Sequence, residues 1–190
     1  YELAKGYVAR GHQVDVVTMR YKGLSAFEVQ DGINIYRVKC WRSHKEICHP
    51  EEQLTYVFFA RQFLKKHLRT HDYNICHAHF IAPTGMVATW LKRFYGLPFI
   101  LTAHGSDVPG YNVDKFLILH RFTRPLLRKI CREAAIIVSP SNYLLNLIKK
   151  RIQHFPEDKL MKIPNGIFID KFTPLPKKKT ILSTGRLLPR

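Results

Sequence analysis

Short apolar segments alternate with longer helical patterns through the second half of the chain, and this rhythm constrains the fold more than any other feature. Strands are predicted at 74–78, 99–103 and 135–139, with a shorter one at 162–163. Helices are predicted between them at 84–95, 114–133 and 141–152. This order favours right-handed crossovers and an α/β fold with a doubly wound, Rossmann-like parallel sheet that is covered on both faces.

Local signals mark the ends of these helices. Gly96 and Pro98 end the first, because glycine suits the left-handed conformation of a C-cap and proline cannot continue a helix. Ser141 is a good N-cap residue for the last. Pro125 lies inside the middle segment, where it removes a backbone donor and clashes with the preceding turn. We therefore expect that helix to be kinked or divided.

The first half carries weaker signals of the same kind. Its predicted elements are a helix over 1–10, strands at 13–19 and 33–38, and a helix from 50 to about 69. An Asp31-Gly32 turn signal precedes the second strand. Cations gather on one face of the long helix.

The two ends of the 190-residue chain lack features of a complete protein. The chain begins with Tyr1, inside a helical pattern, and a strand-like segment at 181–184 has nothing after it to complete a fold. We expect a chain that is cut at both ends. No apolar run approaches the about 18–20 residues that cross a bilayer.

Polar residues follow the predicted strands, where ligands bind in parallel α/β sheets. The loops concerned are 78–83, 103–114, 139–142 and 164–170. His104 is the sharpest candidate, because an imidazole there, with Gly105 and Asp107 after it, can donate to a sugar hydroxyl or a leaving oxygen. The alternative is a loop histidine that bonds only to its neighbours.

The other strand-end residues are less specific. His79 can face a ligand, whereas His77 can face the core. Ser139 and Ser141 are more typical of a helix cap, and Asn165-Gly166 of a turn. The common glycine-rich phosphate motifs do not occur in the sequence. None of these residues alone defines a reaction.

The net charge of +17 leaves three interpretations open. The surface can be generally basic, or it can contact an anionic membrane or a phosphate-bearing substrate. Nucleic-acid binding would need aromatic residues interleaved with the cations in one groove, or a known module. Neither is found, so the charge favours an acidic partner without choosing it.

The cysteines indicate a reducing compartment and no metal centre. Cys76 and Cys131 lie in apolar segments and are predicted to be buried free thiols. A zinc site is conceivable at a cluster that the sequence forms from Cys40, His44, Cys48 and His49. Its spacing matches no usual zinc finger, so no metal is expected, and the cytoplasm fits best.

Several motifs occur in an order and spacing that is similar to glycosyltransferase family 4. They are Gly11-His12-Gln13-Val14, His77-Ala78-His79, Thr102-Ala103-His104-Gly105-Ser106-Asp107, Ser139-x-Ser141, Ile163-Pro164-Asn165-Gly166-x-x-Asp170-x-Phe172-x-Pro174 and Gly185-Arg186-Leu187. Each is weak alone, but together they run in register from the first residues to the last. The chain resembles a member of this family.

The resemblance implies the GT-B arrangement, in which two Rossmann-like domains face each other across a cleft. The N-terminal domain mainly holds the acceptor and the C-terminal domain holds the nucleotide-sugar. By this similarity, 1–172 form the acceptor-side domain without its first strand, 173–179 a linker, and 180–190 the start of the donor domain. Transfer would proceed with retention of anomeric configuration and without a metal or other cofactor.

The resemblance also assigns roles to residues. His104 and Asp107 would be the catalytic pair, His104 beside the donor sugar and Asp107 shaping the acceptor side or the loop. Arg186 would grip the donor diphosphate and offset charge on the leaving phosphate. The remaining candidates for substrate or donor binding are His79, Gly105, Ser106, Asn165 and Gly166.

The expected activity is transfer of a sugar from a nucleotide-sugar to a lipid-linked, phosphorylated or saccharide acceptor. Basic helix faces suit docking at the inner leaflet of a membrane. The chain alone is expected to be inactive, because the family's donor-binding residues would lie after Arg190. The alternatives are a non-catalytic scaffold of GT-B shape, a sugar-nucleotide epimerase and, last, a nucleic-acid binder.

Overall fold

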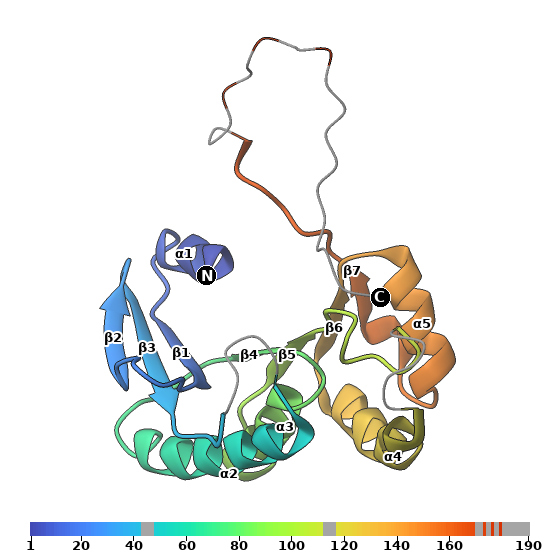
Figure 1. Cartoon of the computed structure of the whole chain (residues 1–190), viewed down its shortest axis with the longest axis horizontal. Coiled ribbons are helices and arrows are strands. Elements are labelled where there is room, and N and C mark those ends of the chain that lie inside the picture. Colours follow the sequence, from blue (N-terminus) through green and yellow to red (C-terminus); the bar gives the residue numbers. More distant parts are fainter. Residues whose placement is uncertain (43–47, 112–116, 170–172, 174–175, 177–178, 180–190) are drawn as a thin grey trace.

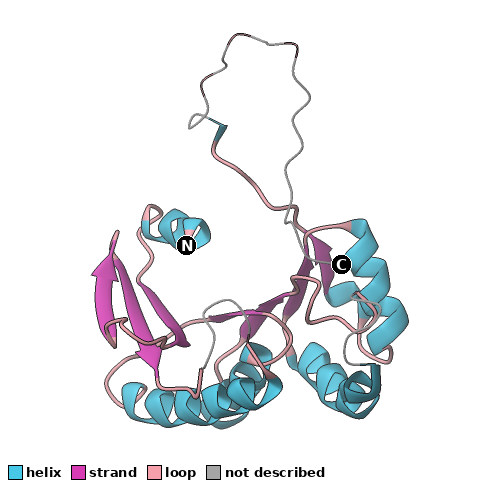
Figure 2. Ribbon diagram, in the orientation of Figure 1, coloured by secondary structure: helices cyan, strands magenta, loops and turns pink. Residues whose placement is uncertain are grey.

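The protein folds into two small β-sheets flanked by helices, as Figures 1 and 2 show. The computed structural model describes residues 1–42, 48–111 and 117–169, together with 173, 176 and 179, and the side chains of these residues except 117–122. The predicted strand at 181–184, and Arg186 with it, lies outside the described residues.

The first sheet has three strands in the order β1-β3-β2. They are β1 (Val14–Met19), β2 (Phe27–Gln30) and β3 (Ile33–Val38). β1 and β3 are parallel, with Val14 opposite Ile33, and confirm the two predicted strands. β2 was not predicted and pairs antiparallel with β3. Asp31 and Gly32 turn the chain between them with φ values of 50° and 74°.

The second sheet is parallel throughout and has the order β4-β5-β6-β7. Its strands are β4 (Cys76–His79), β5 (Phe99–Thr102), β6 (Ile136–Ser139) and β7 (Leu160–Lys162). All four lie within a few residues of their predicted positions. The parallel α/β arrangement is therefore confirmed, with one antiparallel edge strand, β2, added to it.

The helices also follow the sequence pattern. They are α1 (Glu2–Val8), α2 (Pro50–His67), α3 (Thr84–Tyr95), α4 (Leu117–Glu133) and α5 (Asn142–Ile152), with a short 3-10 turn at Glu157–Lys159. Gly96 ends α3 with φ 68°, and the Ser141 hydroxyl caps α5 by accepting the Leu144 N–H. α4 runs through Pro125 as one helix, so the expected division does not occur.

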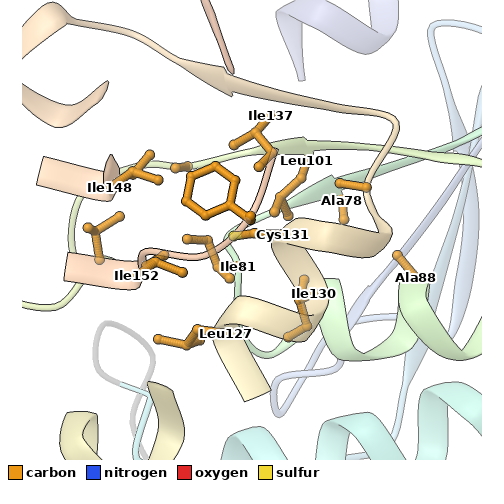
Figure 3. Packing of buried hydrophobic residues seen from close by; sticks show 14 of the residues in the cluster. Ala78, Ile81, Ala88, Leu101, Leu127, Ile130, Cys131, Ile137, Ile148 and Ile152 are labelled. Carbon is orange, nitrogen blue, oxygen red and sulfur yellow. The ribbon is translucent and has the colours of Figure 1, made fainter. Parts of the chain in front are cut away.

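The main core lies between the second sheet and the helices that follow its strands (Figure 3). Phe99, Leu101 and Ile137 are fully buried there, and Cys131 of α4 packs among them. Burial raises the pKa of the Cys131 thiol to about 12 and that of half-buried Cys76 to about 11. Both are free thiols that stay protonated at neutral pH, and the predicted burial is confirmed for Cys131 but is only partial for Cys76.

Candidate active site

The carboxyl ends of the second sheet bring the predicted candidates to one edge. β4, β5 and β6 are parallel, so His79, the loop after Thr102 and Ser139 all lie where these strands end. His104 is exposed there, two residues beyond β5. The expectation that this loop emerges at the carboxyl edge of a parallel sheet is confirmed.

His77 and His79 lie on one face of β4, because side chains two residues apart in a strand point the same way. Their rings stack with centroids 4.4 Å apart. His77 Nε2 lies 2.7 Å from the Thr102 hydroxyl, and its Nδ1 lies 3.4 Å from the Tyr7 hydroxyl. Burial lowers the pKa of His77, and the charge of His104 lowers it further. His77 is thus held as a neutral ring behind His79.

His79 and His104 form a direct pair. His79 Nδ1 lies 3.1 Å from His104 Nε2, and the Phe80 ring lies 4.6 Å from the His104 ring. Burial of its ring, followed by the charges of His77 and His104, lowers the pKa of His79 to about 4. A neutral His79 can share one hydrogen bond with His104, which leaves His104 Nδ1 for a substrate.

Asp107 fixes the loop that carries His104. One carboxylate oxygen accepts the His104 and Gly105 N–H groups at 3.0 and 2.9 Å. The other accepts the Ile81 N–H at 2.7 Å. Asp107 therefore ties the loop after β5 to the loop after β4, and these described bonds all go to backbone.

Two features of the structure require a glycine at position 105, namely a positive φ angle and the close Tyr111 ring. Its φ is 106°, and an added Cβ would lie 2.7–2.9 Å from three ring atoms of Tyr111. Within the protein, the space beside this glycine is thus filled by the Tyr111 ring. Ser106 beside it is exposed.

We expect Gly105→Ala to lower the free energy of unfolding by about 1–3 kcal/mol, because both the φ angle and the Tyr111 ring oppose a methyl group. Gly11→Ala keeps the positive φ, 83°, in open space, and Gly166→Ala has neither constraint. Urea unfolding of the three variants should rank them in that order. Equal losses for Gly105→Ala and Gly11→Ala would show that the Tyr111 contact contributes nothing.

A pH dependence follows from His79. Its folded pKa, about 4, lies below the value of 6.5 for a free side chain, so the unfolded chain binds more protons between these pH values. The stability that neutral His79 contributes is complete above pH 6.5 and is lost as the pH falls toward 4. His79→Gln should flatten this part of a stability profile measured by urea unfolding, whereas His154→Gln should not. Identical slopes in wild type and His79→Gln would contradict the shift.

The remaining candidates lie apart from the histidine pair or serve the fold. The buried Ser139 hydroxyl donates to the Ser141 carbonyl at 3.0 Å, and Ser141 is the helix cap that the sequence favoured, with its hydroxyl accepting the Leu144 N–H at 3.2 Å. Asn165 and Gly166 lie in the exposed segment 163–169, which leads away from the second sheet in Figure 1. No described contact joins them to His104.

Sequence reasoning missed the aromatic residues around the site. Phe80 contacts His104, and Tyr111 fills the space beside Gly105. The Tyr143 ring lies 6.2 Å from that of Tyr111. The positions of Phe80 and Tyr111 in strand-end loops were the available signal, because only the polar residues of these loops were considered, whereas Tyr143 lies in the first turn of α5.

A metal-binding cluster and a membrane-spanning helix are both absent from the part of the chain that the structure describes. No group of three or more His, Cys, Asp or Glu side chains in it is placed to hold a metal ion, while His44 of the proposed cysteine–histidine cluster lies outside it. Within the same residues, no helix is both long and apolar enough to span a bilayer.

The arrangement of strands and helices defines the class of protein. It is similar to two solved structures of sucrose-phosphate synthase from Thermosynechococcus elongatus. One has a TM-score of 0.73 at 15% identity and covers 92% of this chain and 43% of that one. The other has a TM-score of 0.66 at 14% identity and covers 87% of this chain and 82% of that one. The fold is the Rossmann-like α/β fold of GT-B glycosyltransferases.

The family follows from the sequence. The model of Glycosyltransferase Family 4 matches residues 1–171, and the chain belongs to that family. Two uncharacterized glycosyltransferases of Methanocaldococcus jannaschii are relatives, one 28% identical over 170 residues and the other 24% identical over 136. These matches cover 87% and 64% of this chain but 40% and 36% of the relatives, so the chain spans less than half of their length.

Proposed function

We propose that this chain is the acceptor-side part of a retaining glycosyltransferase that takes its sugar from a nucleotide-sugar. The observation that carries the proposal is the position of the exposed His104 side chain. Its loop lies at the carboxyl edge of the sheet and is fixed by Asp107, and its ring is paired with that of His79 at the end of β4. A preorganised polar group at such an edge is what a group-transfer site requires.

His104 would contact a hydroxyl of the donor sugar and orient the anomeric carbon. With His104 Nε2 engaged by neutral His79, Nδ1 is the nitrogen left for that hydroxyl. Which of the two nitrogens donates within the pair decides whether Nδ1 accepts from the sugar or donates to it. Asp107 would act through the loop as a positioning residue, and exposed Ser106 would meet the substrate.

The rest of the substrate would be held by residues beyond this site. Arg186 would bind the donor diphosphate and offset the charge that builds on the leaving phosphate, in place of a metal ion. Asn165 and Gly166 would form the turn before the hinge between the two domains. The acceptor would be a saccharide, a lipid-linked sugar or a phosphorylated compound.

Titration with UDP- and GDP-sugars tests this division of roles. The 190-residue chain should bind them poorly and transfer no sugar, whereas the complete protein should bind and consume a nucleotide-sugar. Turnover by the chain alone at the rate of the complete protein would contradict the proposal. Binding by the complete protein without any turnover would favour the non-catalytic scaffold, and a changed sugar on an intact nucleotide would favour the epimerase.

We further propose that α2 docks the protein on an anionic membrane. Leu54 and Phe58 are exposed on α2 at 62% and 57%, and Arg61 and Lys65 follow on the same face at helical spacing. Exposed apolar side chains beside cations are typical of helices that lie in the membrane interface. Lys149, on the basic face of α5, pairs with Glu157 at 2.9 Å, and on α2 the Arg61 guanidinium lies over the Trp90 ring, 5.1 Å from its centroid.

Vesicle binding by the complete protein measures this interaction. Replacing Lys65 of α2 and Arg69, which is exposed in the turn just after that helix, with Gln should weaken binding to phosphatidylserine-containing vesicles about 30-fold, since each cation contributes about 1 kcal/mol near an anionic leaflet. Lys22→Gln, in the loop after β1, is the matched control. Wild-type binding that does not fall with added salt would rule out the electrostatic contribution.

A further inference from the structure

A hollow of about 340 Å³ lies where the parallel strands β1 and β3 of the first sheet end. Its walls are the loops after these two strands and one face of α2, and we call it the β1–β3 hollow. Cations and aromatic rings line it together: Arg20, Tyr21, Lys22, Lys39, Trp41 and Phe59. Its volume lies within the range of about 300–1,000 Å³ that is usual for small-molecule sites. Carboxyl ends of parallel strands are also where ligands of α/β proteins bind.

Hydrogen bonds hold the walls of the β1–β3 hollow together. The Arg20 N–H donates to the Val38 carbonyl of β3 at 2.8 Å, and the Cys40 thiol donates to the Arg20 carbonyl at 3.4 Å. The Trp41 N–H donates to the Thr55 hydroxyl of α2 at 3.2 Å. The two loops and the helix are therefore in place before a ligand arrives, which lowers the entropic cost of binding.

The cations of the hollow have no acidic partner in it. Among the described residues, neither Lys22 nor Lys39 has a hydrogen bond or an ion pair of its side chain, and no acidic side chain lines the hollow. Arg20 Nε donates to the Leu24 carbonyl at 3.1 Å, which uses one of the five donors of the guanidinium. Cations that surround one hollow repel one another, so an anion shared by them is bound favourably.

The aromatic side chains add a second kind of contact. The Trp41 side chain is 75% exposed, although an indole ring is among the largest apolar groups that a protein can bury. Tyr21 and Phe59 are half-buried beside it in the same lining. A flat aromatic ring packs well against the C–H face of a sugar ring, whose hydroxyl groups stay in water. The hollow thus offers an anion site and a sugar platform side by side.

We propose that the β1–β3 hollow is a binding site for a soluble sugar phosphate. Arg20, Lys22 and Lys39 hold the phosphate, and the Trp41 ring packs against the sugar. A phosphomonoester carries about −1.5 to −2 charges at pH 7, and the arginine guanidinium matches the geometry of its oxygens. A single hollow suits one small molecule, whereas a single-stranded nucleic acid binds along a groove that follows its backbone.

This site narrows the acceptor classes left open by the proposed function. If that function holds, the compound in the hollow is the acceptor, and the phosphorylated class is selected over the neutral saccharide and the lipid-linked sugar. Only this last step rests on the proposed function. The binding site itself rests on the lining of the hollow and on the absence of acids among its described residues.

Calorimetric titration of the complete protein with glucose 6-phosphate, inorganic phosphate and glucose tests the site. Glucose 6-phosphate should bind most tightly, because it alone engages both parts. Lys22→Gln and Lys39→Gln should each weaken the binding of glucose 6-phosphate and of inorganic phosphate about 10-fold, since each removes a charge-assisted hydrogen bond. Trp41→Ala should weaken the binding of glucose 6-phosphate alone. Lys129→Gln, an exposed lysine of α4, is the matched control and should bind as wild type does.

The contrary outcomes are equally specific. An equal loss in Lys129→Gln would overturn the proposal, because the general charge of the protein would then hold the anion. Binding that is unchanged in Lys22→Gln and Lys39→Gln would also overturn it. So would capture of phosphatidic acid vesicles or of single-stranded RNA through the same lysines without binding of glucose 6-phosphate. The first of these two would assign the hollow to a lipid headgroup, and the second to a nucleic acid.

Titration needs no turnover, so this proposal and the proposed function fail separately. An inactive complete protein that binds glucose 6-phosphate through Lys22 and Lys39 would contradict the proposed function and support the site. An active transferase whose lysine variants bind glucose 6-phosphate as wild type does would support the function and overturn the site.

Discussion

His104→Ala should lower kcat/KM of the complete glycosyltransferase about 10²–10³-fold, while its fold and stability stay near those of wild type. This is the cost of removing one preorganised polar contact to a reacting group. The side chain is exposed, and its described partners are His79 and the Phe80 ring, so little of the core depends on it.

Two controls separate chemistry from structure at His104. His154→Ala removes an exposed histidine elsewhere and should leave the rate unchanged. His104→Asn keeps a polar atom near the position of Nδ1, and His104→Gln keeps one near Nε2. Better retention of activity by Asn would agree with Nδ1 facing the sugar. Full activity of His104→Ala would instead support the scaffold interpretation.

Asp107→Ala should destabilise the protein by about 2–4 kcal/mol and also lower the transfer rate. The substitution leaves the N–H groups of Ile81, His104 and Gly105 without their charged acceptor. Hydrogen bonds to charged groups contribute about 1.5–3 kcal/mol each, and water can replace part of this at an exposed loop. Urea unfolding measures the stability, and steady-state kinetics of the complete protein measures the rate.

Asp107→Asn distinguishes positioning from direct catalysis. The amide keeps one acceptor oxygen, so stability should be lost only in part and activity should fall in proportion. An Asn variant with wild-type stability but an activity as low as that of Asp107→Ala would contradict the positioning role. It would restore the catalytic role that the sequence first predicted for this carboxylate.

Strong local signals made much of the fold predictable. α3 has the predicted bounds, 84–95, because its apolar periodicity ends at a glycine that adopts φ 68°. The strand β2 was missed because its apolar residues do not form a buried face. Phe27 and Val29 are exposed at 47% and 60%, so the alternation of apolar and polar residues gives only a weak signal there. The Asp31-Gly32 signal indicated the strand after the turn and was not applied to the one before it. Of the two outcomes expected at Pro125, a kink or a division, the division does not occur, because α4 continues through this residue.

The sequence predicted the sheet edge at which the site lies, but not the hydrogen bonds that connect its residues. Parallel topology places His79 and His104 at neighbouring strand ends, yet their 3.1 Å contact depends on ring orientations that the sequence does not encode locally. Asp107 bonds to the backbone of Ile81, 26 positions away. Such a bond to a main-chain N–H leaves no signature in residue types, so the sequence did not decide whether Asp107 shapes the acceptor side or the loop.

The anomeric configuration of the released sugar tests the central claim most directly. The complete protein would be incubated with UDP-glucose or GDP-mannose, with water as the acceptor, and the anomeric proton of the free sugar formed would be followed by NMR before it mutarotates. The account predicts that the donor is consumed with its α configuration kept, and that His104→Ala suppresses this reaction. A β product, or equal consumption by wild type and His104→Ala, would contradict it.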